Sequence, residues 1–415
     1  MLLSVLRHRR YRRLFAAQVV ALVGTGLLTV ALGLLAYDIA GSDAGAVLGT
    51  ALAIKMVAYV AVAPVITAVT DRVPRKVLMV SADAVRAVIA LMLPFVGHTW
   101  QVYALIFVLQ AASATFTPTF QSVIPSVLED EDEYTRGLSL SRLAYDLESL
   151  LSPVLAAALL TVVSYNLLFL GTVAGFALSA ALVVTTRLPR LVPVDRSIPL
   201  GHRITRGARV MMDRPVLRGL LAMNLGVAAA TGLVVVNTVV YVRDLLGGSN
   251  TGVALALGSY GGGSMLVALL VPRLLTRFGD RTLMLTGAGI LPVGLATAAT
   301  ISAVDPSPGR GWAVLAVTWI GLGAGTSMIN TPAARLLRAE STPESRASVF
   351  TAQFSLSHAC FLLTYPIAGW VGAAAGQFTA AVILTALATL AATTASRVWP
   401  ADEAAVGVEV VTAGR

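Results

Sequence analysis

Long apolar stretches follow one another along almost the whole chain, with only short polar hinges between them. Of all residues, 57% are hydrophobic and 12% are charged, whereas soluble domains carry about 25% charged residues. A bilayer core about 30 Å thick requires roughly 20 apolar residues per helix, so 415 residues have room for about twelve spans and no sizeable soluble domain. The chain is therefore expected to be a polytopic membrane protein.

The spans are expected to be α-helices, because a backbone surrounded by lipid must form its hydrogen bonds within its own segment. The predicted fold is thus an all-α membrane protein with 12 transmembrane helices. The apolar stretches are residues 14–36, 46–70, 77–97, 100–127, 138–163, 165–186, 216–242, 252–276, 283–303, 312–334, 347–375 and 378–398.

Positive charge gathers at every second hinge, and cytoplasmic hinges of membrane proteins are enriched in Lys and Arg. The remaining hinges carry only Arg243 and Arg310. An even number of spans with both termini in the cytoplasm satisfies this pattern. Membrane topology then accounts for the formal net charge of +9 without nucleic-acid binding. The basic residues are Arg7, Arg9, Arg10, Arg12 and Arg13 in the N-terminal tail, Arg72, Arg75 and Lys76 in the second hinge, seven arginines from Arg187 to Arg214, and Arg277, Arg281, Arg335, Arg338 and Arg346 in the corresponding hinges of the second half.

An internal repeat divides the chain into halves. The hinge TDRVPRK at Thr70 to Lys76 has a counterpart, LTRFGDR, 205 residues further along. Both halves have the same orientation, which is the parallel arrangement of secondary transporters with a site near the bilayer midplane. We expect a six-helix bundle over residues 1–187, a cytoplasmic linker over 188–214, a second six-helix bundle over 215–400 and a cytoplasmic tail over 401–415.

The hinge at Asp71, Arg72, Arg75 and Lys76 resembles the signature of the major facilitator superfamily, although Thr67 and Pro74 replace its usual glycines. Within that family the chain looks most like the drug/proton antiporter branch that includes macrolide efflux, enterobactin-export and nickel-resistance proteins. This finer resemblance is carried by ADAVRA from Ala82, FTPTFQSVIPSVL from Phe116 and SLSRLAYDLESLLSP from Ser139. It implies that Asp71, Arg72 and Arg75 are residues of an inner gate, whereas cations that only enforce topology are the simpler alternative.

The resemblance is incomplete in the segments that couple transport to protons in many antiporters. The stretch 100–127 contains no Arg, and Ser152 precedes Pro153 where glycine is usual. Ionisable groups deep in membrane helices are costly and mark cavities or partners. Asp146 and Glu148 are therefore the predicted proton-coupling acids, pointing about 200° apart around their helix. The alternative for Asp146 is an ion pair with Arg142 at i−4.

The other ionisable and polar residues in apolar stretches have more than one interpretation each. Asp83 and Arg86 share a helix face and are predicted to pair, as a latch on the inner gate or as transport residues. His358 and Cys360 suit a transition metal such as nickel, but they are also typical of packed side chains, or of a proton-carrying histidine. Lys55 either pairs with an acid or contacts an anionic substrate. Asn330, like Asn224 and Asn237, either lines a cavity or bonds between helices.

The predicted function is secondary active, proton-coupled export of a small solute, either drug-like or a divalent transition metal, by alternating access. The alternatives are a siderophore or metabolite exporter and, less consistent with the repeat, a membrane-embedded enzyme or a channel. No ATP-binding motif is present, so we expect no cofactor and a proton gradient as the energy source. We also expect a monomer in a bacterial cytoplasmic membrane, with a merely solvated acidic hinge at residues 129–133.

Overall fold

The computed structural model describes residues 2–40, 44–70, 73–160, 162–188, 199–248, 250–304 and 308–399, and these residues form helices and connecting turns without a strand. The short helical segments are η1 (Leu2–Arg7), η3 (Ala58–Val62), η4 (Leu93–Phe95), η5 (Ile124–Ser126), η6 (Tyr241–Leu245) and η7 (Ile367–Val371). The α-helices are α1 (Arg9–Ala40), α2 (Ala44–Val57), α3 (Ala63–Val69), α4 (Arg75–Met92), α5 (Thr99–Val123), α6 (Glu131–Leu160), α7 (Tyr165–Val184), α8 (Leu200–Asp213), α9 (Pro215–Val240), α10 (Asn250–Ala303), α11 (Pro308–Ala339), α12 (Arg346–Pro366) and α13 (Gly372–Val398).

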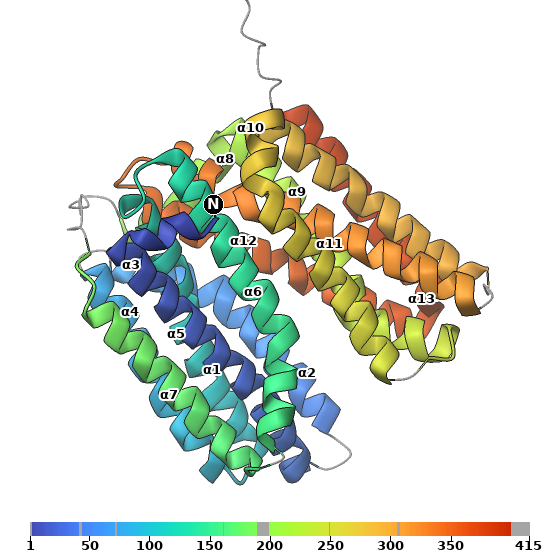
Figure 1. Cartoon of the computed structure of the whole chain (residues 1–415), viewed down its shortest axis with the longest axis horizontal. Helices are drawn as coiled ribbons and strands as arrows, with labels where there is room; N and C mark the ends of the chain where they lie inside the picture. The colour runs from blue at the N-terminus through green and yellow to red at the C-terminus, as the bar shows by residue number, and fades with distance from the viewer. Residues whose placement is uncertain are drawn as a thin grey trace, which may run out of the picture.

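Eight helical stretches among the described residues are long and apolar enough to cross a membrane. Two of them, 49 and 53 residues long, contain one non-helical glycine each, Gly279 in α10 and Gly376 in α13. Their φ angles of 71° and 86° lie in the left-handed region that glycine adopts without steric cost. At Gly279 the two arms of α10 turn back on each other (Figure 1). The predicted hinges after residues 276 and 375 are located at these two glycines.

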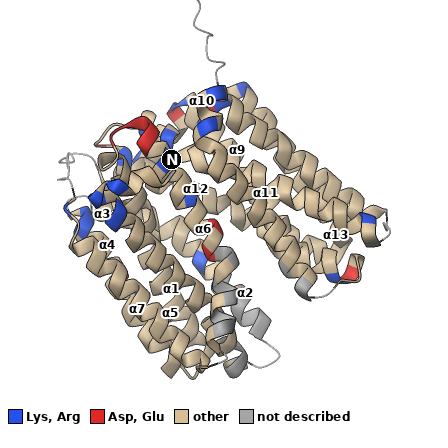
Figure 2. Cartoon of the chain, in the orientation of Figure 1, with Lys and Arg blue, Asp and Glu red and all other residues tan. Residues whose placement is uncertain are grey.

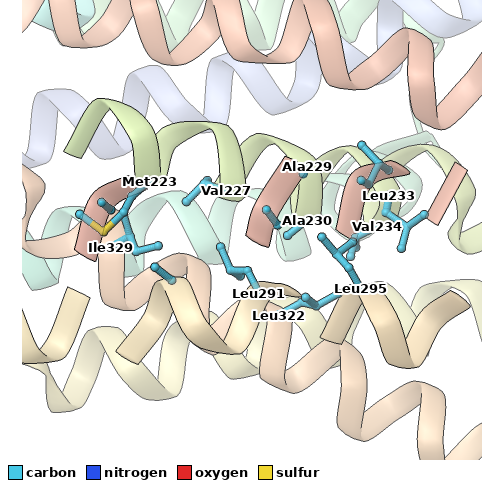
Figure 3. Packing of buried hydrophobic residues seen from close by; sticks show 14 of the residues in the cluster. Met223, Val227, Ala229, Ala230, Leu233, Val234, Leu291, Leu295, Leu322 and Ile329 are labelled. Carbon is cyan, nitrogen blue, oxygen red and sulfur yellow. The ribbon is translucent and has the colours of Figure 1, made fainter. Parts of the chain in front are cut away.

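The helices form two bundles that meet at one end and diverge toward the other (Figure 1). We call α1 to α7 the N-terminal bundle and α9 to α13 the C-terminal bundle. In the C-terminal bundle, α9 packs its buried face against α10 and α11, and Figure 3 shows Met223, Leu291 and Leu322 in this core. The bundles touch each other mainly where α6 contacts α10 and α11, and where η3, α3 and α5 contact α12.

The internal repeat predicted from the sequence is visible in the helix junctions. Pro74 immediately precedes α4, and Gly279, 205 residues later, immediately precedes the second arm of α10. Pro118 and Pro332, from the second pair of related segments, both lie inside helices, α5 and α11. These two pairs of related positions therefore lie at similar places in their helices.

The segment between the bundles is more structured than the predicted linker over residues 188–214. Its described part contains the amphipathic helix α8, which packs on α12 and also touches α3. A Cβ on Gly207 would lie only 1.9 Å from the Ser348 carbonyl oxygen. The two backbones are thus in direct contact, and α8 ties the linker to the C-terminal bundle beside α3 of the N-terminal bundle.

Charged residues concentrate at one end of the molecule (Figure 2). We call it the basic end, and it is where the bundles meet. At this end Arg335 and Arg338 of α11 contact residues 128–131 of the other bundle.

Candidate functional site

At the basic end, Arg335 of α11 joins the two bundles. Its Nη2 lies 3.1 Å from Glu131 Oε1 of α6 and 3.2 Å from Asp280 Oδ2 of α10. Its Nη1 donates a 2.7 Å hydrogen bond to the Thr135 hydroxyl of α6. One guanidinium therefore bonds to α6 from the N-terminal bundle and to α10 within its own bundle, which is the fork geometry that arginine offers.

A second set of contacts joins the bundles one turn further along α11. Arg338 donates hydrogen bonds to the carbonyl oxygens of Glu129, at 2.6 Å, and Leu128, at 3.4 Å. The Tyr134 ring lies under the Arg338 guanidinium, 4.9 Å away, and its hydroxyl donates to the Ala334 carbonyl at 3.1 Å. Residues 129–132 are exposed, as predicted, but the hinge is not solvated alone, because α11 binds it through the Glu129 carbonyl and the Glu131 carboxylate.

The predicted gate hinge is only partly described. Asp71 and Arg72 lie outside the described residues. Arg75 donates a 3.1 Å hydrogen bond to the Ser122 carbonyl, connecting the start of α4 to the end of α5. Close by, the Thr67 and Thr351 hydroxyls, one from each bundle, are 2.9 Å apart.

Arg75, Thr67 and Thr351 line a pocket between the bundles, together with Arg206 of α8 and Glu344. A hydrogen bond with the Thr342 side chain lowers the pKa of the exposed Glu344 carboxyl, and the charges of Arg206 and Arg346 act in the same direction. The carboxylate therefore stays charged beside these arginines.

Asp83 and Arg86 form the predicted ion pair, and both are buried. Ser179 of α7 donates a 2.7 Å hydrogen bond to the second oxygen of Asp83. The Arg86 guanidinium lies between the rings of Phe116 and Phe176, 4.4 and 4.5 Å from their centroids. In this conformation the pair joins α4, α5 and α7 inside the N-terminal bundle, and is not one of the contacts between bundles.

Asp146 is buried midway along α6, where α6 faces α10 of the other bundle. It forms the alternative ion pair, with Arg142 Nη2 3.0 Å from its Oδ1. Ser264 of α10 donates a 2.8 Å hydrogen bond to Asp146 Oδ2 and accepts hydrogen bonds from Arg142 at 3.0 and 3.3 Å. The three side chains form a closed polar triangle that joins the bundles at mid-helix. Glu148, on the other side of α6, is half-buried.

His358 lies in an aromatic cluster on α12 that reaches the N-terminal bundle. Its ring centroid is 4.8 Å from that of Tyr59 and 4.4 Å from that of Phe354. Its Nδ1 is hydrogen bonded to the Phe354 carbonyl at 2.6 Å, and the Cys360 thiol donates to the Leu356 carbonyl at 3.4 Å. Among the described residues no three His, Cys, Asp or Glu side chains are grouped as metal ligands require.

Tyr59 belongs to η3, a single π-helical turn in which the backbone is wider than in an α-helix. The Tyr59 carbonyl accepts a 3.0 Å hydrogen bond from Ser355 of α12. One turn earlier, the half-buried Lys55 places its ammonium 5.5 Å from the centre of the Tyr59 ring. Lys55, Tyr59 and His358 therefore meet where the two bundles touch.

The asparagines named above differ in their surroundings. Asn224 and Gln353 exchange two hydrogen bonds, at 3.0 and 3.1 Å, between α9 and α12. Asn237 donates to the Ala368 carbonyl at 2.9 Å. Both thus bond between helices of one bundle. Asn330 is half-buried in α11.

A comparison with known protein families shows which family this chain belongs to. The family model of the Major Facilitator Superfamily matches residues 14–249, more than half of the chain. The chain belongs to the Major Facilitator Superfamily. This major facilitator protein is accordingly a multi-pass membrane transporter and not an enzyme.

Individual proteins also resemble this transporter. Macrolide efflux protein A of Streptococcus pyogenes is 25% identical over 310 residues, which cover 72% of this chain and 74% of that protein. The Enterococcus faecalis protein of the same name is 25% identical over 277 residues, covering 63% and 83%.

Solved transporters share the fold at lower identity. A bacterial homologue of the iron transporter ferroportin, in an outward-facing state, superposes with a TM-score of 0.75 at 15% identity over 94% of this chain and 98% of its own. The E. coli fucose:proton symporter superposes with a TM-score of 0.71 at 16% identity, over 94% and 98%.

Proposed function

We propose that this transporter exports a small, drug-like solute in exchange for protons, by alternating access. The efflux assignment draws on the macrolide efflux proteins of two bacterial species, which are 25% identical to this chain. Their bacterial origin also supports a location in a bacterial cytoplasmic membrane.

In this proposal the helices make twelve crossings, with α2 and α3 forming one crossing and the two arms of α10 forming two. The basic end and both termini face the cytoplasm, as positively charged hinges favour. The contacts of Arg335 and Arg338 with the N-terminal bundle are then a closed inner gate, and the divergence of the bundles at the other end corresponds to an outward-facing state.

One observation carries the coupling hypothesis: the Asp146 carboxylate is held by its own bundle and by the opposite bundle at once. Arg142 neutralises it from α6, and Ser264 donates to it from α10. A buried pair of this kind is stable only while both charges are present. Protonation of Asp146 would leave Arg142 without its counter-charge and weaken the contact between α6 and α10. Proton uptake would thereby be linked to movement of the bundles, with Glu148 as a second acid.

A metal substrate has less support. Among the described residues, no group of three His, Cys, Asp or Glu side chains that could hold a metal ion forms around His358 and Cys360. A solute with an apolar, aromatic surface fits the rings of Tyr59, Phe354 and Phe361 better than a metal ion does.

The test is transport in proteoliposomes with an imposed pH gradient, using ethidium and a macrolide as solutes and nickel as a third arm. Wild-type protein should accumulate at least one organic solute only when the gradient is present. Asp146→Asn should lose the gradient-driven component while it still binds the solute. Asp213→Asn, an exposed carboxylate change at the end of α8, is the matched control and should transport normally.

Two results would contradict the proposal. Gradient-driven flux that is unchanged in Asp146→Asn would remove this residue from proton coupling. Nickel flux that needs His358, measured with His358→Ala, would favour the metal alternative over the drug-like solute.

A further inference from the structure

A hollow at the basic end contains arginines that play no part in the contacts between bundles. It is lined by Arg9, Arg10 and Arg13 of α1 and by Thr185, Thr186 and Arg187 just after α7. Its volume of about 530 Å³ lies within the range of roughly 300–1,000 Å³ of small-molecule pockets. We call this hollow the arginine pocket. It belongs to the N-terminal bundle alone, because α1 and α7 pack against each other.

Within the described part of the chain, no acidic side chain balances the charge of the arginine pocket. Among the described residues, none of its four arginines forms an ion pair, and no Asp or Glu lines it. Arg13 is fixed in place by a 2.6 Å hydrogen bond from its Nη1 to the Thr185 carbonyl. Like charges held this close repel one another, so an anion that enters the pocket gains from all four guanidinium groups. Arginine and threonine side chains are both good donors to phosphate oxygens.

The depth of the pocket points to the source of that phosphate. The apolar span of α7 ends at Val184, directly before Thr185, and the apolar part of α1 begins at Leu14, directly after Arg13. The pocket therefore lies at the level where hydrocarbon gives way to headgroups. Val184 is 51% exposed and offers an apolar surface immediately beside the polar lining. A soluble anion makes no favourable contact with this apolar surface, whereas the acyl chain of a lipid can pack against it.

We infer that the arginine pocket binds the phosphate of an anionic phospholipid, with the acyl chains running along α7. Basic pockets next to membrane helices on the cytoplasmic side recognise anionic headgroups in this way. The bound lipid supplies the negative charge that the pocket lacks and bridges the start of α1 to the end of α7. This binding is separate from the transported solute and from Asp146.

The experiment measures lipid binding directly. Purified full-length protein is placed in phosphatidylcholine nanodiscs with increasing phosphatidylglycerol, and the phosphatidylglycerol retained after delipidation is quantified by native mass spectrometry. The wild type should retain phosphatidylglycerol in preference to phosphatidylcholine. Each arginine near a membrane surface contributes roughly a fivefold gain in affinity, so Arg10→Gln combined with Arg187→Gln should weaken retention about 25-fold.

The matched control is Arg7→Gln combined with Arg12→Gln. It removes the same charge from the same end of the chain, but neither residue lines the pocket. Retention in this control should fall clearly less than in the pocket variant, because Arg7 and Arg12 donate no hydrogen bond to the bound phosphate. An equal loss in both double variants would show diffuse attraction and overturn the inference. So would wild-type protein without a preference for phosphatidylglycerol, or displacement of the lipid by excess inorganic phosphate, which would indicate a free-anion site. If the pocket variant unfolds in a melting assay, single Arg10→Gln and Arg12→Gln variants give the same comparison.

Discussion

The buried ion pair of Asp83 and Arg86 shows how much one charged residue can contribute to the stability of the N-terminal bundle. Asp83 is fully buried and accepts from Ser179, while Arg86 is held between two phenylalanine rings. Removing one partner leaves an uncompensated charge among apolar side chains. Asp83→Asn is therefore expected to destabilise the N-terminal bundle by about 3–5 kcal/mol.

Thermal unfolding in detergent checks this expectation. The double variant Asp83→Asn with Arg86→Gln, which removes both charges, should recover part of the lost stability. Melting temperatures for Asp83→Asn equal to wild type would mean that the pair does not stabilise the bundle.

Residue pairs were predictable from the sequence where the partners are neighbours on one helix. Asp83 with Arg86, and Arg142 with Asp146, are three and four residues apart, and helical periodicity alone brings them together. The pairing of Arg335 with Glu131 was not predictable, because it depends on how the two bundles meet. One signal was available: Asp280 directly follows Gly279 in the hinge that corresponds to residues 70–76.

The residues predicted to bind substrate show more clearly what the sequence alone cannot predict. His358 and Cys360 have side chains that suit a transition metal, but among the described residues no third His, Cys, Asp or Glu is grouped with them as a metal site requires. Which side chains gather from other helices depends on tertiary packing, which helical periodicity does not give. Nor could it foresee that Tyr59 would meet His358 from the other bundle.

At the scale of helices, the apolar stretches predicted from the sequence coincide with helices of the structure, although their ends differ by up to seven residues, as at the start of α6. The prediction missed α8, whose amphipathic pattern was hidden in a segment rich in Arg and Pro. It also missed the π-helical turn η3, which depends on tertiary contacts rather than on composition.

The packing of α10 on α11 relies on two glycines. A Cβ on Gly263 would lie 2.1 Å from the Ile320 carbonyl oxygen, and one on Gly323 would lie 1.9 Å from the Tyr260 carbonyl oxygen. Gly263→Ala should therefore force the helices apart and destabilise the C-terminal bundle by roughly 1–3 kcal/mol.

Gly262→Ala, one residue earlier on α10, is the matched control, because nothing lies within 4 Å of its added Cβ. Alanine is the better helix former, so this control should be neutral or slightly stabilising. The melting temperatures of the two variants are compared, and that of Gly263→Ala should be the lower. Equal melting temperatures would contradict close packing at Gly263.

For the whole molecule, the proposed alternating access requires that the bundles separate at the basic end during each transport cycle. The described contacts between them run from Arg338 at that end to the Asp146 triangle at mid-helix, and all of those at the basic end must break for the inner gate to open. Polar contacts suit this task, since each contributes only about 1–3 kcal/mol net.

The most direct measurement locks this gate with a disulfide. Thr67→Cys and Thr351→Cys are combined in a Cys360→Ser background, because the two hydroxyls are only 2.9 Å apart and Cys360 is the single native cysteine. After oxidation in proteoliposomes, solute flux should stop, and it should return on reduction, while each single-cysteine variant should transport with or without oxidant. Full flux through protein that mass spectrometry shows to be completely cross-linked would contradict alternating access at this end.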